Sequence, residues 1–287
     1  MDTFAIRALT LPEFPPLLAE IPQPPKKLWA IGNLPPPDLK LLAVVGSRKY
    51  TTYGKQVVEH LIGGLAGYPI GIISGLALGI DSLAHEAALE HGLYTVAVPG
   101  SGLDDSVIYP ASHKRLAHRI VESGGGLLSE FEPTLAAAKW TFTQRNRIMA
   151  GMCHATLLIE AAEKSGTLIT ARMAADYNRE LLVVPGSIFT KTSAGTHQFL
   201  KLGATPITDA LDILSVLGIT PEETSTLPLP ELSPLETRVI TLLHEPTDRD
   251  TLIRQLDLPA HEASTLLMQM ELNGLIVPYD NTYRSAI

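Results

Sequence analysis

The stretch LLAVVGSRKYTTYG, residues 41–54, decides the fold, because a buried strand, a small-residue turn and a helix start follow one another in it. The apolar run at its beginning predicts a strand, and a helix is expected to follow the turn. In the turn, Gly46 lets backbone N–H groups approach a ligand, Ser47 can donate a hydrogen bond, and Arg48 offers a bidentate cation. The turn is therefore a candidate phosphate-binding loop, although a tight turn with a solvated arginine explains the same residues.

Strand and helix patterns alternate after this stretch. Further β-branched or Leu-rich runs lie at residues 70–74, 94–98, 126–130, 155–160 and 180–184, and helical spacing at 53–65, 81–91, 144–152 and 168–177. Short apolar strands separated by helices are typical of a parallel sheet that is covered on both faces. The sequence therefore predicts an α/β fold with an extended, Rossmann-like, doubly wound and mostly parallel sheet. Ligands of such sheets bind at the carboxyl ends of the strands.

Two proline-rich stretches divide the 287 residues. We expect an N-terminal extension and proline-rich lead-in over 1–40, a Rossmann-like domain over 41–217, a proline-rich linker over 218–233 and a winged-helix domain over 234–287. Three helical segments and a short hairpin support the last assignment. The net charge is −8, but residues 217–287 hold 11 acidic and 4 basic side chains. Because the acidity belongs almost wholly to the tail, the central domain remains compatible with nucleic acid.

The segment KWTFTQRNRIMAG, residues 139–151, interleaves cations with aromatic rings. Its three cations and two rings are Lys139, Arg145, Arg147, Trp140 and Phe142. Proteins that hold a single strand use cations along the phosphates and a ring that stacks on an unpaired base. The alternative is that both rings are buried in the core, with the arginines solvated or paired with Glu130 and Glu132.

Two further strand-to-helix turns are expected at the same sheet edge. In the first, residues 74–85, Asp81 is positioned to cap or begin the next helix, and a structural role for the turn is slightly favoured. In the second, Ser165, Gly166 and Thr167 stand at a helix start. Three such turns at one edge predict a broad anion-binding surface rather than a single nucleotide pocket.

The sequence does not assemble a catalytic centre. His85-Glu86 lacks the second histidine of a zinc-protease helix, and Cys153 is the only cysteine, which leaves no thiolate cluster for a metal. We therefore expect no catalytic residue, metal or cofactor, and a protein that is not an enzyme. The first thirty residues do not resemble an export signal, and the longest apolar stretch, residues 70–80, is too short to span a membrane. These features predict a cytoplasmic protein without a membrane role.

Seven motifs follow one another along the chain. They are GSRKYTTYG, SGLALGID, VAVPGSG, SEFEP, RNRIMAG, EAAEKSGTLITA and VVPGS. In this order they closely resemble the DprA/Smf family, the bacterial DNA-processing proteins of natural transformation, over about residues 41–215. The resemblance implies a recombination mediator that binds single-stranded DNA, protects incoming DNA and loads the recombinase RecA onto it. It also implies a homodimer, with single-strand-binding protein as a further partner.

The resemblance also implies a set of DNA-binding residues. Carried over motif by motif, they are Gly46, Ser47, Arg48, Lys139, Phe142, Arg145, Asn146, Ser165, Gly166 and Thr167. Two departures matter. Thr143 follows the phenylalanine where the family often has proline, and GTH at 195–197 replaces a Gly-x-Asn segment, so His197 is not included.

Two other classes of protein share some of these features. The Ser-Gly-Thr turn after Glu160 resembles the glycine-rich motif of the LOG-type nucleotide hydrolases, which makes a nucleotide-processing or nucleotide-sensing Rossmann protein the alternative. The basic and aromatic segment argues against it, because a small nucleotide does not need it. A winged-helix transcription regulator is disfavoured, because the expected recognition helix, residues 261–273, has no Lys or Arg. We expect that domain to contact protein, or the sister subunit, rather than DNA.

Overall fold

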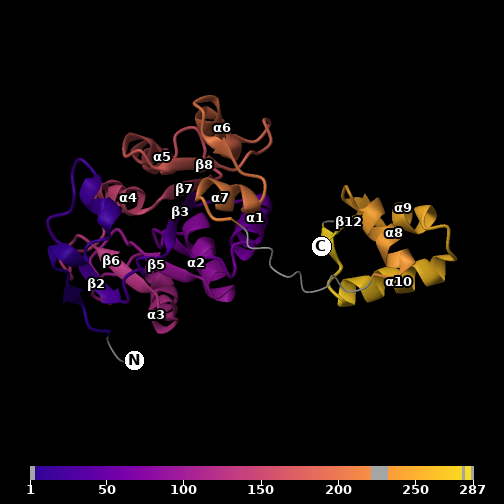
Figure 1. The fold of residues 1–287 in the computed structure, drawn as a ribbon, viewed down its shortest axis with the longest axis horizontal. Coiled ribbons are helices and arrows are strands. Elements are labelled where there is room, and N and C mark those ends of the chain that lie inside the picture. The colour runs from indigo at the N-terminus through magenta and orange to yellow at the C-terminus, as the bar shows by residue number, and fades with distance from the viewer. Residues whose placement is uncertain (1–3, 221–231, 280–281, 286–287) are drawn as a thin grey trace. The chain divides into compact units, whose positions relative to one another are not determined.

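The computed structural model describes residues 4–220, 232–279 and 282–285. The chain forms two compact units, Met1–Pro221 and Glu222–Ile287 (Figure 1). The larger unit is built on one sheet of nine strands: β1 (Arg7–Ala8), β2 (Trp29–Gly32), β3 (Lys40–Gly46), β4 (Ile70–Ser74), β5 (Tyr94–Ala97), β6 (Gly126–Ser129), β7 (Ala155–Ile159), β8 (Glu180–Val183) and β9 (Thr205–Pro206).

The strand order is β1-β2-β6-β5-β4-β3-β7-β8-β9. Seven strands, from β6 to β9 in this order, are parallel to their neighbours, and β1 and β2 add an antiparallel edge. The chain starts its parallel part at β3, winds through β4, β5 and β6, and then returns to β7 on the other side of β3. The predicted doubly wound, mostly parallel sheet is thus confirmed, and its topological switch point lies at β3 and β7.

Helices cover both faces of this sheet (Figure 1). They are α1 (Thr52–Gly63), α2 (Ile80–Glu90), α3 (Lys114–Glu122), α4 (Lys139–Met152), α5 (Thr167–Asp176), α6 (Ala194–Lys201) and α7 (Ala210–Val216). Alternate residues of β3 enter opposite layers of the core. Leu41 and Val45 pack with the layer of α4, α5 and α6, and Leu42 and Val44 with that of α1, α2 and α7.

The first forty residues belong to the larger unit. Besides β1 and β2 they form the short 3-10 helices η1 (Leu11–Glu13) and η2 (Pro16–Glu20), and Leu18, Ile21 and Leu28 are buried in the core. A side chain on Gly151 of α4 would meet Ile21, with 2.8 Å between a Cβ and Ile21 Cγ2. This close approach lets the N-terminal segment lie directly against α4.

Three helices, α3, α6 and α7, were not anticipated from the sequence. In α3 the buried residues Leu116, Ala117 and Ile120 have helical spacing, so the signal is present but short. Two further 3-10 turns, η3 (Ala111–His113) and η4 (Lys191–Ser193), precede α3 and α6. Helix α4 begins at Lys139, five residues before the predicted start at residue 144, so it includes the whole basic and aromatic segment.

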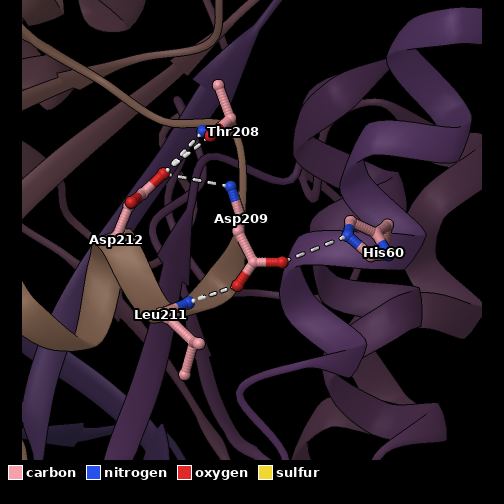
Figure 2. Close-up of polar contacts among 5 residues, drawn as sticks. All are labelled: His60, Thr208, Asp209, Leu211 and Asp212. Atoms are coloured by element: carbon pink, nitrogen blue, oxygen red, sulfur yellow. Dashed lines mark hydrogen bonds and ion pairs between the residues drawn. The ribbon is translucent and has the colours of Figure 1, made fainter. Parts of the chain in front are cut away.

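Helix α7 is fixed at its first turn by two carboxylates (Figure 2). Asp209 accepts a hydrogen bond from the backbone N–H of Leu211 at 2.8 Å, and Asp212 accepts one from the N–H of Thr208 at 2.8 Å. The second oxygen of Asp209 lies 3.8 Å from Nε2 of His60 on α1. These contacts satisfy N–H groups that the helix itself leaves unpaired and hold α7 beside α1.

The smaller unit has the elements of a winged helix. Its helices are α8 (Pro234–Leu242), α9 (Arg249–Gln255) and α10 (Ala260–Leu272), and its sheet has the order β10-β12-β11, with β10 (Thr247–Asp248), β11 (Ile276–Tyr279) and β12 (Thr282–Ser285). Ser233 caps α8 and Glu236 closes the capping box. Val239, Leu252 and Leu267 are buried in its own hydrophobic core. The predicted winged-helix fold is confirmed.

Candidate nucleic-acid interface

A cavity of about 470 Å³ opens at the carboxyl ends of the strands, where β3 and β7 form the switch point. Nine of the ten residues expected to bind DNA line it: Gly46, Ser47, Arg48, Phe142, Arg145, Asn146, Ser165, Gly166 and Thr167. Lys139 is outside the lining. It is the first residue of α4 and its side chain is exposed to solvent. The fold thus gathers three sequence segments, which lie up to 121 positions apart, at one edge of the sheet.

The Gly46-Ser47-Arg48 turn is rigid at its base and exposed at its tip. A Cβ on Gly46 would come within 2.6 Å of Ile80 Cγ1, so glycine is required for packing. Ser47 Oγ donates to Lys49 O at 2.8 Å and accepts from Lys49 N–H at 3.1 Å, which closes a local turn. This turn directs the exposed side chains of Arg48 and Lys49 towards the cavity.

The first turn of α1 is occupied by a carboxylate of the protein itself. Glu160, the residue after β7, accepts hydrogen bonds from Thr51 N–H at 2.9 Å and from Thr51 Oγ1 at 2.5 Å. Its backbone has a φ of +49°, and its side chain is buried against Gly54. The helix start after the turn is therefore already neutralised by an anion, and the cations Arg48 and Lys49 are the groups left to attract a phosphate.

Arg145 is buried beneath the floor of the cavity. Its Nη1 donates to the carbonyl of Val98, while its Nε has no hydrogen-bond partner among the described residues. The guanidinium fills the space that a side chain on Gly75 would need. Burial lowers the pKa of Arg145 to about 10, and the nearby Asp81 carboxylate opposes this shift. Arg145 therefore remains charged at neutral pH.

Asp81 lies beside Arg145 in the same lining. It accepts a hydrogen bond from the N–H of Gly75 at 3.1 Å. Burial raises the pKa of its carboxyl group, and the positive charge of Arg145 counteracts that shift. The SGLALGID turn is thus a structural support for the buried arginine, in line with the role favoured from the sequence. The lining holds three cations, Arg48, Lys49 and Arg145, and one carboxylate, so its balance favours an anion.

Phe142 contacts a cation and a second ring. The Cζ atom of Arg48 is 5.2 Å from the centre of the Phe142 ring, within the range of a cation–π interaction. The ring of Tyr109 is 5.6 Å away on a centroid-to-centroid measure, tilted by 59°. A Cβ on Gly100 would collide with the Phe142 ring, which explains the glycine in VAVPGSG. Phe142 is partly buried, so its ring is held in position and still reaches the cavity.

The third turn joins the cavity through hydroxyl groups. Thr167 Oγ1 donates to the carbonyl of Gly46 at 2.9 Å, and Ser165 Oγ donates to Thr167 Oγ1 at 2.9 Å. Gly166 is the N-cap of α5, with a φ of −59° and open space where a side chain would be. The Ser165-Gly166-Thr167 turn therefore braces the first turn and forms the opposite wall.

Each of the two interpretations of the basic and aromatic segment, an exposed binding surface or buried rings with paired arginines, holds for part of it. The Trp140 side chain is 55% exposed, so it is not a core residue, and it makes a T-shaped contact with Phe131 at 5.6 Å. Arg147, by contrast, forms an ion pair with Glu130, as the alternative expected. Lys49 and Tyr109 were not among the residues expected to bind DNA. Lys49 carries a local signal as the neighbour of Arg48, whereas Tyr109 reaches the site through the fold. Asp81 lies in the first turn of α2 but does not cap it, because the N-cap is Gly79 and the Asp81 carboxylate accepts from Gly75 instead.

The described part of the chain contains no group of three or more His, Cys, Asp or Glu residues arranged to hold a metal ion. Over the same residues, no helix is long and apolar enough to cross a membrane.

A sequence model of the family described as DNA recombination-mediator protein A matches residues 6–218. The chain belongs to this family. The resemblance to DprA/Smf proteins is thereby confirmed, and a second model, the DprA winged helix domain, matches residues 223–280. Protein Smf of Escherichia coli is 35% identical over 285 residues, covering 94% of this chain and 74% of that protein. The DNA processing protein DprA of Streptococcus pneumoniae is 41% identical over 198 residues, 69% of each chain.

Solved structures of the family share the fold. The X-ray structure of DprA from Streptococcus pneumoniae superimposes with a TM-score of 0.68 at 38% identity, covering 73% of this chain and 74% of that one. DNA processing protein A from Helicobacter pylori superimposes with a TM-score of 0.66 at 30% identity, covering 75% of this chain and 96% of that one. The latter structure was described for the unique single-stranded DNA binding mode of that protein.

Proposed function

We propose that this protein is a recombination mediator that binds single-stranded DNA in the cavity at the carboxyl ends of β3 and β7. The observation that carries the proposal is the Arg48–Phe142 pair, a cation 5.2 Å from a ring at the rim of a cavity with a positive balance of charge. A phosphate would contact Arg48 and Lys49, while an unpaired base would stack on Phe142. The single-stranded DNA binding described for the Helicobacter pylori relative supports the same ligand.

A single strand fits this site better than a duplex. The bases of a duplex are stacked on one another and paired, so a ring that lines a cavity reaches their faces only after they are splayed out. The contacts available are to phosphates and to the faces of bases, which are common to all sequences. We therefore expect binding with little sequence preference and with strong salt dependence.

Membership in the mediator family supports the proposed role in transformation and the proposed protein partners. The protein protects incoming single strands and loads RecA onto them in the cytoplasm during natural transformation, as a homodimer and in exchange with single-strand-binding protein. It does so by binding and not by catalysis, without a cofactor.

The decisive measurement is the affinity for fluorescent single-stranded and duplex oligonucleotides across a salt series. We expect preference for the single strand, and a loss of roughly 5- to 100-fold in Phe142→Ala, the effect of removing one stacked base. Phe142→Leu keeps an apolar side chain but lacks the aromatic face, so it should bind nearly as weakly as the alanine variant. Equal affinity for both DNA forms, or indifference to these substitutions, would refute the proposal.

The phosphate contacts have their own readout in the same salt series. Arg48→Ala and Lys49→Ala should each reduce the slope of log affinity against log salt by about 0.7, the value for one phosphate of a single strand, because both side chains line the cavity. Arg119 is exposed on α3 and does not line the cavity, so Arg119→Ala is the matched control and should keep the full slope.

Recombinase loading is tested separately. RecA would be added to single strands covered with single-strand-binding protein, and its ATP hydrolysis followed with and without this protein. Stimulation by the wild type that is lost in Arg48→Ala would support the mediator role. Stimulation that is absent in the wild type would limit the function to DNA binding.

A further inference from the structure

A second groove, of about 1040 Å³, lies next to the first cavity. Thr143 of α4 lines both, so the two hollows are neighbours on this helix. The groove runs between α4 and the N-terminal segment that follows η2, and α4 lies beside this segment in Figure 1. A strand leaving the first cavity past Thr143 would enter it.

Trp140 supplies this groove with an aromatic surface. The side chain is 55% exposed, and its T-shaped contact with Phe131, at 89° between the ring planes, orients the indole. Indole is a large, flat apolar ring, so an exposed indole face offers a wide surface for stacking. Because an oriented, solvent-facing ring loses little entropy on binding, it is suited to stacking on a base.

The remaining lining provides cations for phosphates. It contains Lys26, Lys27 and Arg147 against one carboxylate, Glu130. Glu130 is nearly buried and its charge is matched by Arg147, which also donates to the carbonyl of Gln23. These contacts tie the N-terminal segment to α4 and leave the two lysines as the exposed charges of the groove.

The two lysines differ in their surroundings. Lys27 Nζ lies 3.2 Å from Glu132 Oε1, but both side chains are more than 60% exposed, so water screens this ion pair. Lys26 has no carboxylate within ion-pair distance in residues 4–220, 232–279 and 282–285. Lys26 is therefore the residue best placed to contact a phosphate.

We propose that this groove is a second binding site for the same DNA strand, in which Trp140 stacks on a nucleobase and Lys26 contacts a phosphate. The cavity at Phe142 is called the first station of the strand, and this groove the second station. The inference rests on the proposed function, because the strand must first occupy the cavity at Phe142. It extends the binding surface from the switch point of the sheet to the N-terminal segment, and it makes Trp140 a determinant of the length of strand that is bound.

A length series of oligothymidylates tests this, from about 4 to about 16 nucleotides, the range of site sizes known for single-strand-binding folds. In the wild type, affinity should rise with length until the strand spans both stations. Trp140→Ala should bind the shortest strands like the wild type and the longest ones roughly 5- to 100-fold more weakly. Trp140→Phe keeps a ring and should recover most of the affinity for long strands.

Two further readouts are specific for this groove. Trp29, the other tryptophan, is mostly shielded from solvent, so quenching of tryptophan fluorescence by long strands should disappear in Trp140→Phe. Lys26→Ala should reduce the salt slope by about 0.7 for long strands and leave it unchanged for short ones. Leu211 is 56% exposed on α7 and lines neither hollow, so Leu211→Ala is the control for loss of an exposed apolar side chain.

The outcomes separate the two proposals. If Trp140→Ala equals the wild type at every length while Phe142→Ala binds weakly throughout, the second station is refuted and the cavity stands. If the wild type binds no single strand, or if neither ring matters, the proposed function fails and the second station with it. An unchanged melting temperature of each variant shows that the differences arise from binding.

Discussion

The guanidinium of Arg145 occupies the volume that a side chain on Gly75 would take. The two residues come from different motifs, and their fit explains why a glycine follows β4 at this position. Gly75 also donates its N–H to Asp81, which lies beside the arginine. The space for the buried guanidinium thus depends on the absence of a side chain at Gly75.

Gly75→Ala should therefore displace Arg145. We expect a loss of about 1–3 kcal/mol in the free energy of unfolding, the usual effect of overpacking, and weaker binding of single-stranded DNA. Gly166 provides the control: it lines the same cavity, but a Cβ there meets no atom within 4 Å. The φ of −59° at Gly166 suits alanine, so Gly166→Ala should not lower the free energy of unfolding and should raise it by up to about 1 kcal/mol. Similar effects of the two substitutions would contradict this explanation.

Glu160 should be important for the position of the Gly46-Ser47-Arg48 turn. In Glu160→Ala the N–H and hydroxyl groups of Thr51 lose a charged partner, which should lower the free energy of unfolding by about 1.5–3 kcal/mol. The turn that precedes Thr51 should loosen and DNA affinity should fall. Glu163 is exposed, so Glu163→Ala makes the same change in charge without this loss. Thermal unfolding and oligonucleotide titration of both variants check the prediction, which fails if the pair behaves alike.

His85 should make the larger unit sensitive to acid. It is fully buried, with Nδ1 2.8 Å from Thr95 Oγ1, and burial lowers its pKa from 6.5 to about 3. Between these values the unfolded chain binds a proton that the folded chain excludes, so the free energy of unfolding falls as the pH falls. From pH 7 to pH 5 this histidine should account for a loss of roughly 2 kcal/mol.

Urea unfolding at the two pH values measures this loss. Both tryptophans, Trp29 and Trp140, belong to the larger unit, so their fluorescence follows that unit alone. His85→Gln can keep the hydrogen bond to Thr95 but does not titrate, and its stability should therefore fall less between pH 7 and pH 5. Equal losses in the variant and the wild type would show that other groups cause the acid sensitivity.

The winged-helix unit should be dispensable for binding of single strands. Its longest helix, α10, contains no Lys or Arg, and Met268 and Leu272 expose apolar surface on it. A protein that ends at residue 220 should therefore keep the affinity and the salt slope of the full chain. A large loss of affinity in a truncated protein that still folds and dimerises would show that this unit contacts DNA.

Local patterns were sufficient for much of the architecture. The run at 70–74 matches β4 residue for residue, and the other strand predictions differ from the structure by one or two positions at their ends. Periodicity failed for α3, because only three buried positions mark it. The beginning of α4 was also missed, because the aromatic and β-branched residues of KWTFT have weak helix propensity, while the hydrogen bond from Thr141 Oγ1 to the carbonyl of Gly100 joins that turn to a distant loop.

The sequence by itself determined the parallel sheet and the three turns at its carboxyl edge, because strand and helix periods are local and parallel strands end on the same side. Only the tertiary structure decided which charges face the cavity. Arg145 is buried over Gly75, Arg147 is paired with Glu130, and Glu160 accepts from Thr51, a partner 109 positions away. Burial and pairing of this kind depend on distant neighbours. Only the folded chain therefore distinguishes the exposed Arg48 from the buried Arg145 and the paired Arg147.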